Sequence, residues 1–489
     1  MTKQQMSVLW VFLLSMMMLA SALVLLSKPA RAQIESTASA ETVPAVLPNP
    51  LPSPLLGGQA SIYNVTPNAF GQPIPGLERH QELLFFVGNS FFNQNWVTAP
   101  ASTTARDGLG PLFNARSCAS CHFKDGRGRA PEFAGEAPTG FLLRLGINER
   151  DIYGERSPEP NYGMQFQDHA ILDVPKEGDF FIDYEEIAGE YPDGTSYSLR
   201  KPHYRFENLA YGEFHPEVVM SGRVANQMIG LGLLEAINEA DLLTWADPND
   251  QDGDGISGRP NWVWDVLNQR MTVGRFGWKA EQPSILQQTS AAFSGDIGIT
   301  TDIFPGAHCA PDQQACLQAL SGSNAQTEPE IIADDLLKVT LYSSTLAVPA
   351  QRDIDTPDVQ AGAVLFSDIG CSGCHLESVT TGIHPTIPAL SYQQIRPYTN
   401  LLLHDMGDGL ADGLSDFQAT GREWRTPPLW GIGLFETVNK HTTYLHDGRA
   451  RNLEEAILWH GGEAEASQEN FKQLSREQRE QLLSFLRSL

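Results

Sequence analysis

Two stretches carry the pattern C-x-x-C-H, namely Cys118-Ala119-Ser120-Cys121-His122 and Cys371-Ser372-Gly373-Cys374-His375. Two thiols three positions apart lie on one turn of a helix, and the histidine follows directly. This spacing is the attachment pattern of c-type haem, because both thiols can add to the vinyl groups of one porphyrin while the histidine binds its iron. The sequence therefore predicts two covalently bound haem c groups.

A C-x-x-C pair by itself has two other common uses, as a thioredoxin-like dithiol and as half of a zinc site. A thioredoxin motif lies in a βαβ context that this sequence lacks, and it is not normally followed by histidine. A zinc site would need both pairs to meet, with His122 and His375 incidental. Haem attachment is the better interpretation of both motifs.

Two cysteines remain, Cys309 and Cys316, in a segment rich in Pro, Gly and Gln. We expect a local disulfide in an oxidising compartment. The alternative is a redox-active dithiol, for which His308 is the one neighbour able to lower a thiol pKa.

The composition is that of a folded, strongly acidic protein. Hydrophobic residues make up 41% of the 489 residues, and 33 Lys and Arg face 59 Asp and Glu, a formal net charge of −26. Such a surface repels phosphate backbones, so nucleic-acid binding is excluded and a basic or neutral partner is favoured. Residues 253–258 spell G-x-G-x-x-G without a preceding strand, which leaves nucleotide chemistry unsupported.

The N-terminus predicts export to the periplasm. Lys3 precedes an apolar run over residues 8–26, and Ala30-Arg31-Ala32 fits a signal-peptidase site. We expect residues 1–32 to be a signal peptide and residues 33–58, rich in Pro, Ser, Ala and Thr, to be a flexible leader. The run is long for a signal peptide, so an uncleaved membrane anchor is the alternative.

The surroundings of the two motifs repeat. Gly88 with Phe91-Phe92 precedes the first motif, and Gly362 with Leu365-Phe366 precedes the second. This resembles the entry helix of class I cytochrome c domains, so we expect a mainly α protein with two such haem domains, over residues 59–342 and 356–489. Apolar spacing from Arg476 to Leu486 predicts the last helix.

The first of these domains is too long for one cytochrome. Aromatic and β-branched runs flank Pro192-Asp193-Gly194, which predicts strands around a turn. We expect a small antiparallel β insertion over about residues 140–212.

Residues 247–261 contain a candidate calcium loop. Asp250, Asp252 and Asp254 alternate with a glycine at the sixth position, as in the first half of a calcium-binding loop. The twelfth position is Asn261 rather than Glu, so Asp247 or Asp265 would have to complete the shell. We expect a structural calcium ion, and a plain acidic turn is the alternative.

Nearly all of the chain after the leader resembles a known family. The resemblance rests on residues 425–433 (RTPPLWGIG), 444–450 (YLHDGRA), 108–127 (GLGPLFNARSCASCHFKDGR), 274–279 (GRFGWK) and 459–463 (WHGGE). These stretches are similar to those of the bacterial di-haem cytochrome c peroxidase superfamily, and most similar to its di-haem oxidoreductase branch, often labelled thiol oxidoreductases. The thiol label is not supported, because both C-x-x-C pairs are used by haem.

The resemblance implies different roles for the two haems. The first, on His122, would face the substrate with an open or loosely capped distal side. The second, on His375, would be six-coordinate and pass electrons, with a downstream distal ligand that is usually Met or Tyr. Met406 lies in the right interval and is the expected ligand, because a thioether raises haem potential. His404 is the alternative.

Reduction of peroxide needs a distal acid–base group and a donor or cation that stabilises the departing charge. The candidates are Arg275, Lys279, Glu281 and Gln282. For each of them, a position on a solvated helix face is an equally good interpretation. Trp278 would relay electrons between the haems, as a Trp does in the superfamily, with Trp262 and Trp264 as competitors and a core role as the plain alternative.

Three further residues are candidates for the haem edge. Arg425 and Arg449 would pair with propionates, because guanidinium binds carboxylate bidentately. His446 would support the haem edge or brace Asp447. A surface ion pair is the alternative for both arginines.

The predicted function is that of an exported di-haem peroxidase-like oxidoreductase. The second haem would receive electrons from a small donor protein, and the first would reduce hydrogen peroxide or another oxidant. Two alternatives remain: oxidation of an organic or protein substrate, for which the β insertion would build a surface, and pure electron transfer with both irons six-coordinate.

Overall fold

The computed structural model describes residues 53–306, 308–320, 322 and 329–489. The predicted signal peptide and most of the predicted leader lie outside these residues. No helix within these ranges is long and apolar enough to cross a membrane. Residues 51–489 form one unit by their contacts, and the predicted boundary between two haem domains stays a prediction.

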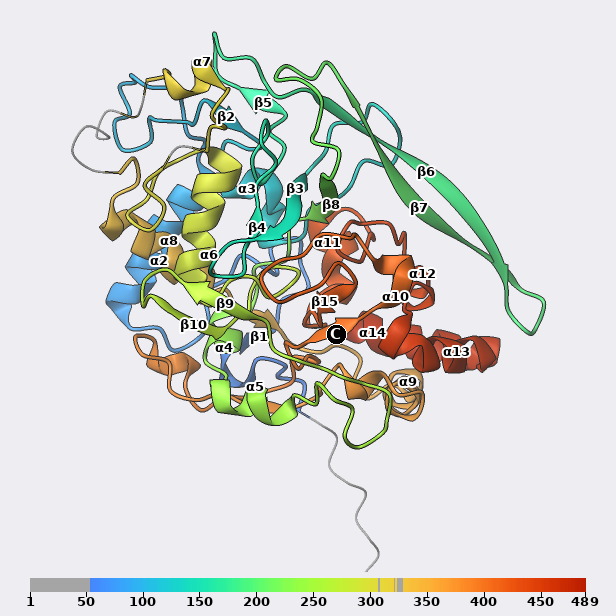
Figure 1. Ribbon diagram of the computed structural model, residues 1–489. Helices are drawn as coiled ribbons and strands as arrows, with labels where there is room; N and C mark the ends of the chain where they lie inside the picture. The colour runs from blue at the N-terminus through green and yellow to red at the C-terminus, as the bar shows by residue number, and fades with distance from the viewer. Residues whose placement is uncertain (1–52, 307, 321, 323–328) are drawn as a thin grey trace, which may run out of the picture. The chain divides into compact units, whose positions relative to one another are not determined.

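The helices and strands follow one another in many short pieces (Figure 1). The helices are α2 (Arg79–Asn93), α3 (Cys118–Cys121), α4 (Leu231–Glu235), α5 (Glu239–Trp245), α6 (Ile285–Ala292), α7 (Gln314–Leu317), α8 (Ala333–Ser344), α9 (Pro357–Asp368), α10 (Gly407–Leu410), α11 (Phe435–Asn439), α12 (Leu453–Leu458), α13 (Glu465–Gln473) and α14 (Arg476–Ser488). The strands are β1 (Ser61–Ile62), β2 (Leu112–Phe113), β3 (Phe141–Arg150), β4 (Arg156–Ser157), β5 (His169–Ala170), β6 (Asp179–Glu190), β7 (Ser196–Glu207), β8 (Val219–Val224), β9 (Trp262–Asp265), β10 (Arg270–Val273), β11 (Val348–Pro349), β12 (Val379–Thr380), β13 (Gln394–Ile395), β14 (Leu403–Asp405) and β15 (Glu423–Arg425).

The expectation of a mainly α protein built from class I cytochrome c domains is wrong. About 30% of the chain is helical and 20% is strand, distributed over seven small sheets among the described residues. Most of these strands have two to six residues. Such short strands give too few positions for an alternating pattern to stand out, so the sequence does not predict them.

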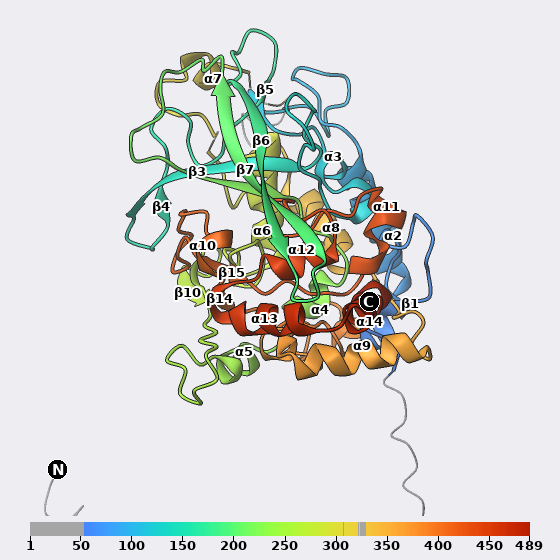
Figure 2. The same cartoon turned by 90° about the vertical axis from the view of Figure 1, so that its right-hand side faces the viewer.

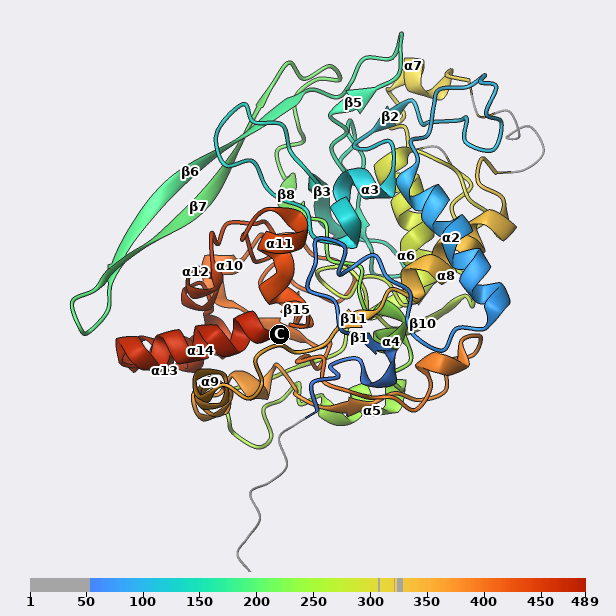
Figure 3. The same cartoon turned by 180° about the vertical axis from the view of Figure 1, so that it is seen from behind.

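Two helix pairs support the two motifs in the same way (Figure 3). Helix α2 crosses α8 at Gly88, where a Cβ atom would lie 2.1 Å from the carbonyl oxygen of Lys338. Helix α9 crosses α14 at Gly362, where a Cβ atom would lie 2.0 Å from the carbonyl oxygen of Gln481. Only glycine permits such close backbone contact.

One turn after each crossing glycine, a phenylalanine reaches the histidine of the motif. The ring centres of Phe92 and His122 are 6.1 Å apart, and those of Phe366 and His375 are 6.2 Å apart. Helix α14 begins at Arg476, as the sequence predicts, because Ser475 and Gln478 form a capping box at its start. The helix pairs therefore fix where the two histidines lie.

The strands predicted around Pro192-Asp193-Gly194 are confirmed as the long hairpin β6–β7. It runs over the outside of the protein toward the C-terminal helices (Figure 2). At its tip Tyr191 donates a hydrogen bond to Glu454 at 2.7 Å, and Asp193 pairs with Arg479 of α14 at 2.7 Å. The hairpin thus ties residues near the first motif to the helices around the second.

Candidate functional site

The first motif opens into a large cavity, here called the first cavity. Its volume is about 1340 Å³ including the open mouth, and Cys118, Cys121 and His122 form part of its wall. Strands β3 and β8, helix α6 and the loop over residues 275–281 supply the opposite walls. A ligand in this cavity would therefore contact both cysteines and His122.

The second motif opens into a second cavity of about 1450 Å³, again including its mouth. Cys371, Cys374 and His375 line it, together with residues from β15, α12 and α14. Its lining is largely apolar, with Phe366, Leu482 and Leu486 near the motif. An apolar wall suits the flat face of a porphyrin.

Both motif histidines are held in the same tautomer. Nδ1 of His122 bonds the carbonyl oxygen of Asn226 at 2.6 Å, and Nδ1 of His375 bonds that of Tyr398 at 2.8 Å. Each Nδ1 is therefore the donor, which leaves Nε2 with a free lone pair, the state required of a metal ligand. Burial lowers the pKa of both imidazoles, that of His375 to about 4, so both are neutral at physiological pH.

Two of the motif cysteines, Cys118 and Cys371, are poorly suited to thiol chemistry. Burial raises the pKa of Cys118 and of Cys371 to about 12, whereas a reactive cysteine needs a lowered pKa. None of the four forms a disulfide. Cys309 and Cys316 do form one, as expected from the sequence.

The two cavities share a wall made by Gln227, Trp278, Arg425 and Pro428. Trp278 is held there by a hydrogen bond of 2.8 Å from its indole Nε1 to the carbonyl oxygen of Val224. Trp262 and Trp264 lie on β9 and line neither cavity. Trp278 is thus the candidate tryptophan that the fold places between the two motifs.

Three buried guanidinium groups face the cavities without an ion-pair partner among the described residues. They belong to Arg275 in the first cavity, Arg127 in the second and Arg425 in the shared wall. Main-chain carbonyl oxygens accept their hydrogen bonds, and burial lowers the pKa of Arg127 and Arg425 to about 10. A buried unpaired cation is costly, and carboxylates of a ligand would offset that cost.

The residues present therefore fit two haem groups. Each haem brings two propionate carboxylates, which would compensate the unpaired guanidinium groups. Each would also find two thiols and a neutral imidazole with a free Nε2. The chemistry of this donor set is that of c-type haem.

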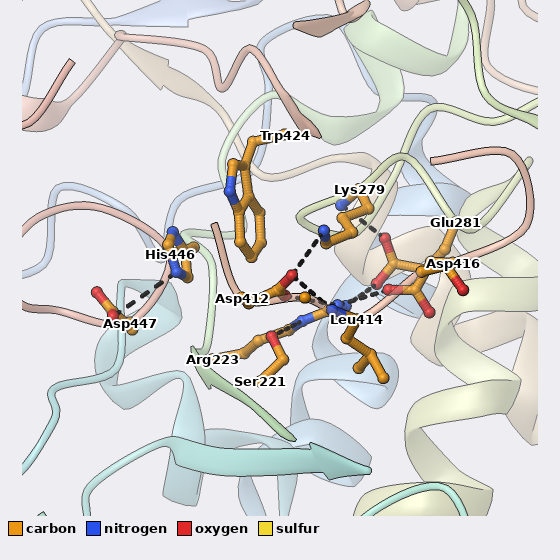
Figure 4. A network of polar contacts seen from close by, with 12 residues as sticks. Ser221, Arg223, Lys279, Glu281, Asp412, Leu414, Asp416, Trp424, His446 and Asp447 are labelled. Carbon is orange, nitrogen blue, oxygen red and sulfur yellow. Dashed lines mark hydrogen bonds and ion pairs between the residues drawn. The ribbon is translucent and has the colours of Figure 1, made fainter. Parts of the chain in front are cut away.

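A network of buried charges lies beside the shared wall (Figure 4). It joins Arg156, Arg223 and Lys279 to Glu281, Asp412 and Asp416. Arg223 donates to Glu281 at 3.1 Å and to Asp416 at 2.5 Å, and Lys279 donates to Asp412 at 3.0 Å. Three positive and three negative groups balance, which is the condition for keeping charges out of water.

Glu281 is the part of this network that reaches the first cavity, together with Arg223. Its second oxygen, Oε2, accepts a hydrogen bond of 2.9 Å from the amide of Lys279. Both oxygens are therefore oriented by donors. Of the predicted distal residues, Arg275 also lines the cavity, whereas Gln282 lines neither cavity and contacts Arg275 and Phe276 through its main chain.

Met406, the expected ligand of the second iron, lines the second cavity, and so does His404. The two ring nitrogens of His404 are both engaged, Nδ1 with Glu463 at 2.7 Å and Nε2 with Asn400 at 3.0 Å. Burial opposes protonation of His404, but contacts with Cys374 and Glu463 outweigh it and raise its pKa to about 9. The contacts with Glu463 and Asn400 occupy both ring nitrogens, so neither is free to bind iron.

His460 is a candidate ligand that the sequence analysis missed. It lines the second cavity, its Nδ1 bonds the carbonyl oxygen of Ala456 at 2.8 Å, and its Nε2 has no partner among the described residues. Burial lowers its pKa. This is the arrangement found at His122 and His375, and the signal for it was the stretch Trp459-His460-Gly461 directly after α12.

His446 and Arg449, both predicted at the haem edge, lie in different surroundings from each other. His446 lines the second cavity and stacks on Trp424 with ring centres 3.6 Å apart. Arg449 lines neither cavity, and its Nε donates to Asp447 at 2.8 Å. The carboxylate that Arg449 contacts is therefore that of Asp447.

The three aspartates of the acidic loop lie together. Carboxylate oxygens of Asp250, Asp252 and Asp254 are within 4.8 Å of one another. Asn261, at the twelfth position, is buried, and its amide donates to the carbonyl oxygens of Lys279 and Asp416 instead. The calcium ion stays a prediction.

Comparison with known families gives one match. The family model described as "Di-haem oxidoreductase, putative peroxidase" matches residues 56–489, which includes both cavities and nearly all described residues. No curated protein matches the chain.

The buried network makes a prediction about pH and stability. Burial raises the pKa of Asp416, but Arg156 and Arg223 outweigh it and lower the pKa to about 2. Because this value lies below that of the unfolded chain, the stabilisation is full above about pH 5 and is lost as pH falls toward 2, a change on the order of 2 kcal/mol. Asp416→Asn should lower the free energy of unfolding at pH 7 by about 3–5 kcal/mol and flatten this acid dependence.

Denaturant unfolding at several pH values measures both effects. Asp408→Asn is the matched control, since Asp408 is 91% exposed and should change stability by less than about 0.5 kcal/mol. An Asp416→Asn variant as stable as the wild type at pH 7 would contradict the prediction.

Proposed function

The chain belongs to this family of di-haem oxidoreductases, and on that premise we propose that it is an exported di-haem cytochrome c that reduces hydrogen peroxide. The proposal is carried by one observation, the pair of cavities that each take one C-x-x-C-H motif and share Trp278. One haem in each cavity would be held by two thioether bonds and by Nε2 of His122 or His375. Their irons would exchange electrons with peroxide and with a donor.

The cavities differ in a way that supports separate roles. His122 is the one histidine among the described residues that lines the first cavity, while His375, His404, His446 and His460 line the second. The first cavity also has charged groups that the second lacks, among them Arg223, Glu281 and Asp296. We therefore assign peroxide to the first cavity and electron relay to the second.

Glu281 and Arg223 would perform the proton chemistry. Reduction of one peroxide to two waters takes two electrons and two protons. Glu281, oriented by Arg223 and by the amide of Lys279, would move a proton between the two peroxide oxygens. Arg223 would stabilise the charge that develops on the departing oxygen, because its guanidinium is already held in place by Asp416.

Electrons would reach the first cavity from the second through the shared wall. Trp278 lines both cavities and is fixed by its hydrogen bond to Val224. A fixed aromatic ring between two cofactors shortens the gap that an electron must cross. Arg425 in the same wall would bind a haem propionate.

We propose His460 as the sixth ligand of the second iron, in place of the expected Met406. The support is its tautomer, since Nδ1 is occupied by Ala456 and Nε2 is free. Met406 offers a thioether in the same cavity, and it remains the alternative.

The compartment of the protein and its electron donor are also proposals. Haem c is attached outside the cytoplasm, and the disulfide between Cys309 and Cys316 fits an oxidising compartment such as the periplasm. The net charge of −26 favours a small basic donor protein, which would dock by charge complementarity.

Covalent haem is tested by removing one thiol from each motif. Cys118→Ser and Cys371→Ser should each lose one of the two thioether bonds to one haem, because serine cannot form it. The pyridine-haemochrome spectrum and the mass of the denatured chain report the change. The double variant Cys309→Ser/Cys316→Ser should keep both haems, and two normal haems in either motif variant would refute the assignment.

The ligand of the second iron is tested by His460→Ala and Met406→Leu. If His460 binds the iron, His460→Ala should turn the second haem high-spin, while Met406→Leu leaves its spectrum unchanged. If Met406 binds it, the oxidised protein should show the weak near-infrared band of thioether ligation, and Met406→Leu should remove that band. Electron paramagnetic resonance and near-infrared absorption distinguish the two.

The activity is tested with peroxide and cyanide on the haem-loaded protein. The haem on His122 should bind cyanide, and cyanide should inhibit peroxide reduction in parallel. Glu281→Gln should lower kcat by about 100-fold or more, with cyanide binding retained, because proton transfer is lost. A protein with two low-spin haems that binds no cyanide and consumes no peroxide would leave electron transfer as its function.

A further inference from the structure

One buried tyrosine lies directly behind the wall of the first cavity. Tyr342 on α8 is fully buried, and its neighbours Val339 and Ser343 line the cavity. Its ring centre is 5.1 Å from that of Phe92, and the ring centre of Phe92 is 6.1 Å from that of His122. Two short aromatic steps thus join Tyr342 to the proposed iron ligand.

The hydroxyl group of Tyr342 has an unusual pair of partners for a buried phenol. It donates a hydrogen bond of 2.5 Å to Oδ1 of Asp125 and accepts one of 2.8 Å from Nδ2 of Asn89. The phenol proton therefore already points at a carboxylate. Asp125 forms no ion pair among the described residues, so no cation competes for that carboxylate.

The second motif has a tyrosine in the corresponding place but with opposite surroundings. The ring centre of Phe366 is 6.2 Å from that of His375 and 5.7 Å from that of Tyr398. The hydroxyl of Tyr398 accepts a hydrogen bond of 2.5 Å from Nη2 of Arg396. No carboxylate among the described residues accepts its proton.

We propose that Tyr342 is a redox site, which gives one electron to the peroxide-oxidised first haem while its phenol proton passes to Asp125. The step breaks the O–H bond of Tyr342 and forms one on Asp125. It leaves a neutral tyrosyl radical and a neutral carboxylic acid, and the first haem gains one electron. The proposal rests on the proposed peroxide activity, since peroxide is the oxidant.

The charges around the two tyrosines explain why only one would react. Loss of an electron without its proton would leave a buried cation, which is costly. At Tyr342 the proton can move to Asp125, so that the positive charge cancels a negative one. At Tyr398 the hydroxyl faces the guanidinium of Arg396, which is paired with Glu377 at 2.9 Å, and no carboxylate among the described residues is placed to take the proton.

Tyr342 would supply an electron when the second haem cannot. Reduction of peroxide needs two electrons, and a second haem that is already oxidised has none to give. Tyr342 would then provide the missing equivalent and hold the oxidation inside the protein until a donor restores it. The path from the first cavity to Tyr342 does not pass through Trp278.

The experiment uses the full-length, haem-loaded protein with both haems oxidised. It is mixed with hydrogen peroxide, frozen within milliseconds to seconds and measured by electron paramagnetic resonance. We expect a radical signal that narrows when the protein is made with ring-deuterated tyrosine. Tyr342→Phe, which keeps the ring and its packing, should reduce the radical yield at least tenfold, and Asp125→Asn should reduce it severalfold.

Tyr162→Phe is the control, since Tyr162 is also buried but its hydroxyl donates to the carbonyl oxygen of Gly212 rather than to a carboxylate, and its radical yield should equal that of the wild type. Haem content and the absorption change of the first haem with peroxide are recorded for each variant. An undiminished signal in Tyr342→Phe would overturn the proposal, as would a first haem that reacts with peroxide without any deuterium-sensitive signal. A first haem whose absorption does not respond to peroxide would instead refute the proposed activity, and the redox site with it.

Discussion

A hydrogen bond from Nδ1 to a main-chain carbonyl oxygen sets the state of each motif histidine. Asn226 accepts it from His122 and Tyr398 accepts it from His375. The bond fixes the tautomer and the ring plane, and burial keeps the ring neutral. The rest of the site depends on this constraint, because each cavity, helix crossing and phenylalanine is arranged around a histidine whose Nε2 is free.

The two cavities share this arrangement of the motif histidine but differ in the charged groups that line them. Arg223 and Glu281 bring a balanced buried network to the first cavity, whereas the second has apolar walls and additional histidines. The unpaired guanidinium groups of Arg127, Arg275 and Arg425 would cost stability in a protein without an anionic ligand. Such a protein is expected to gain stability when two haems bring their propionates.

The two tyrosines that pack against Phe92 and Phe366 also differ in the charged group beside them. Tyr342 points its proton at Asp125, and Tyr398 faces Arg396. Neither tyrosine belongs to a motif. The fold brings Asp125 to Tyr342 from a distant part of the chain, whereas Arg396 lies only two residues before Tyr398.

The sequence by itself predicts the covalent attachment of haem, because the C-x-x-C-H spacing is local. It also predicted the last helix and the long hairpin, where periodicity or a turn signal extends over many residues. It did not predict the small sheets or the role open to His460. These depend on contacts between residues far apart in the chain or on which ring nitrogen is occupied, and only the tertiary structure decides both.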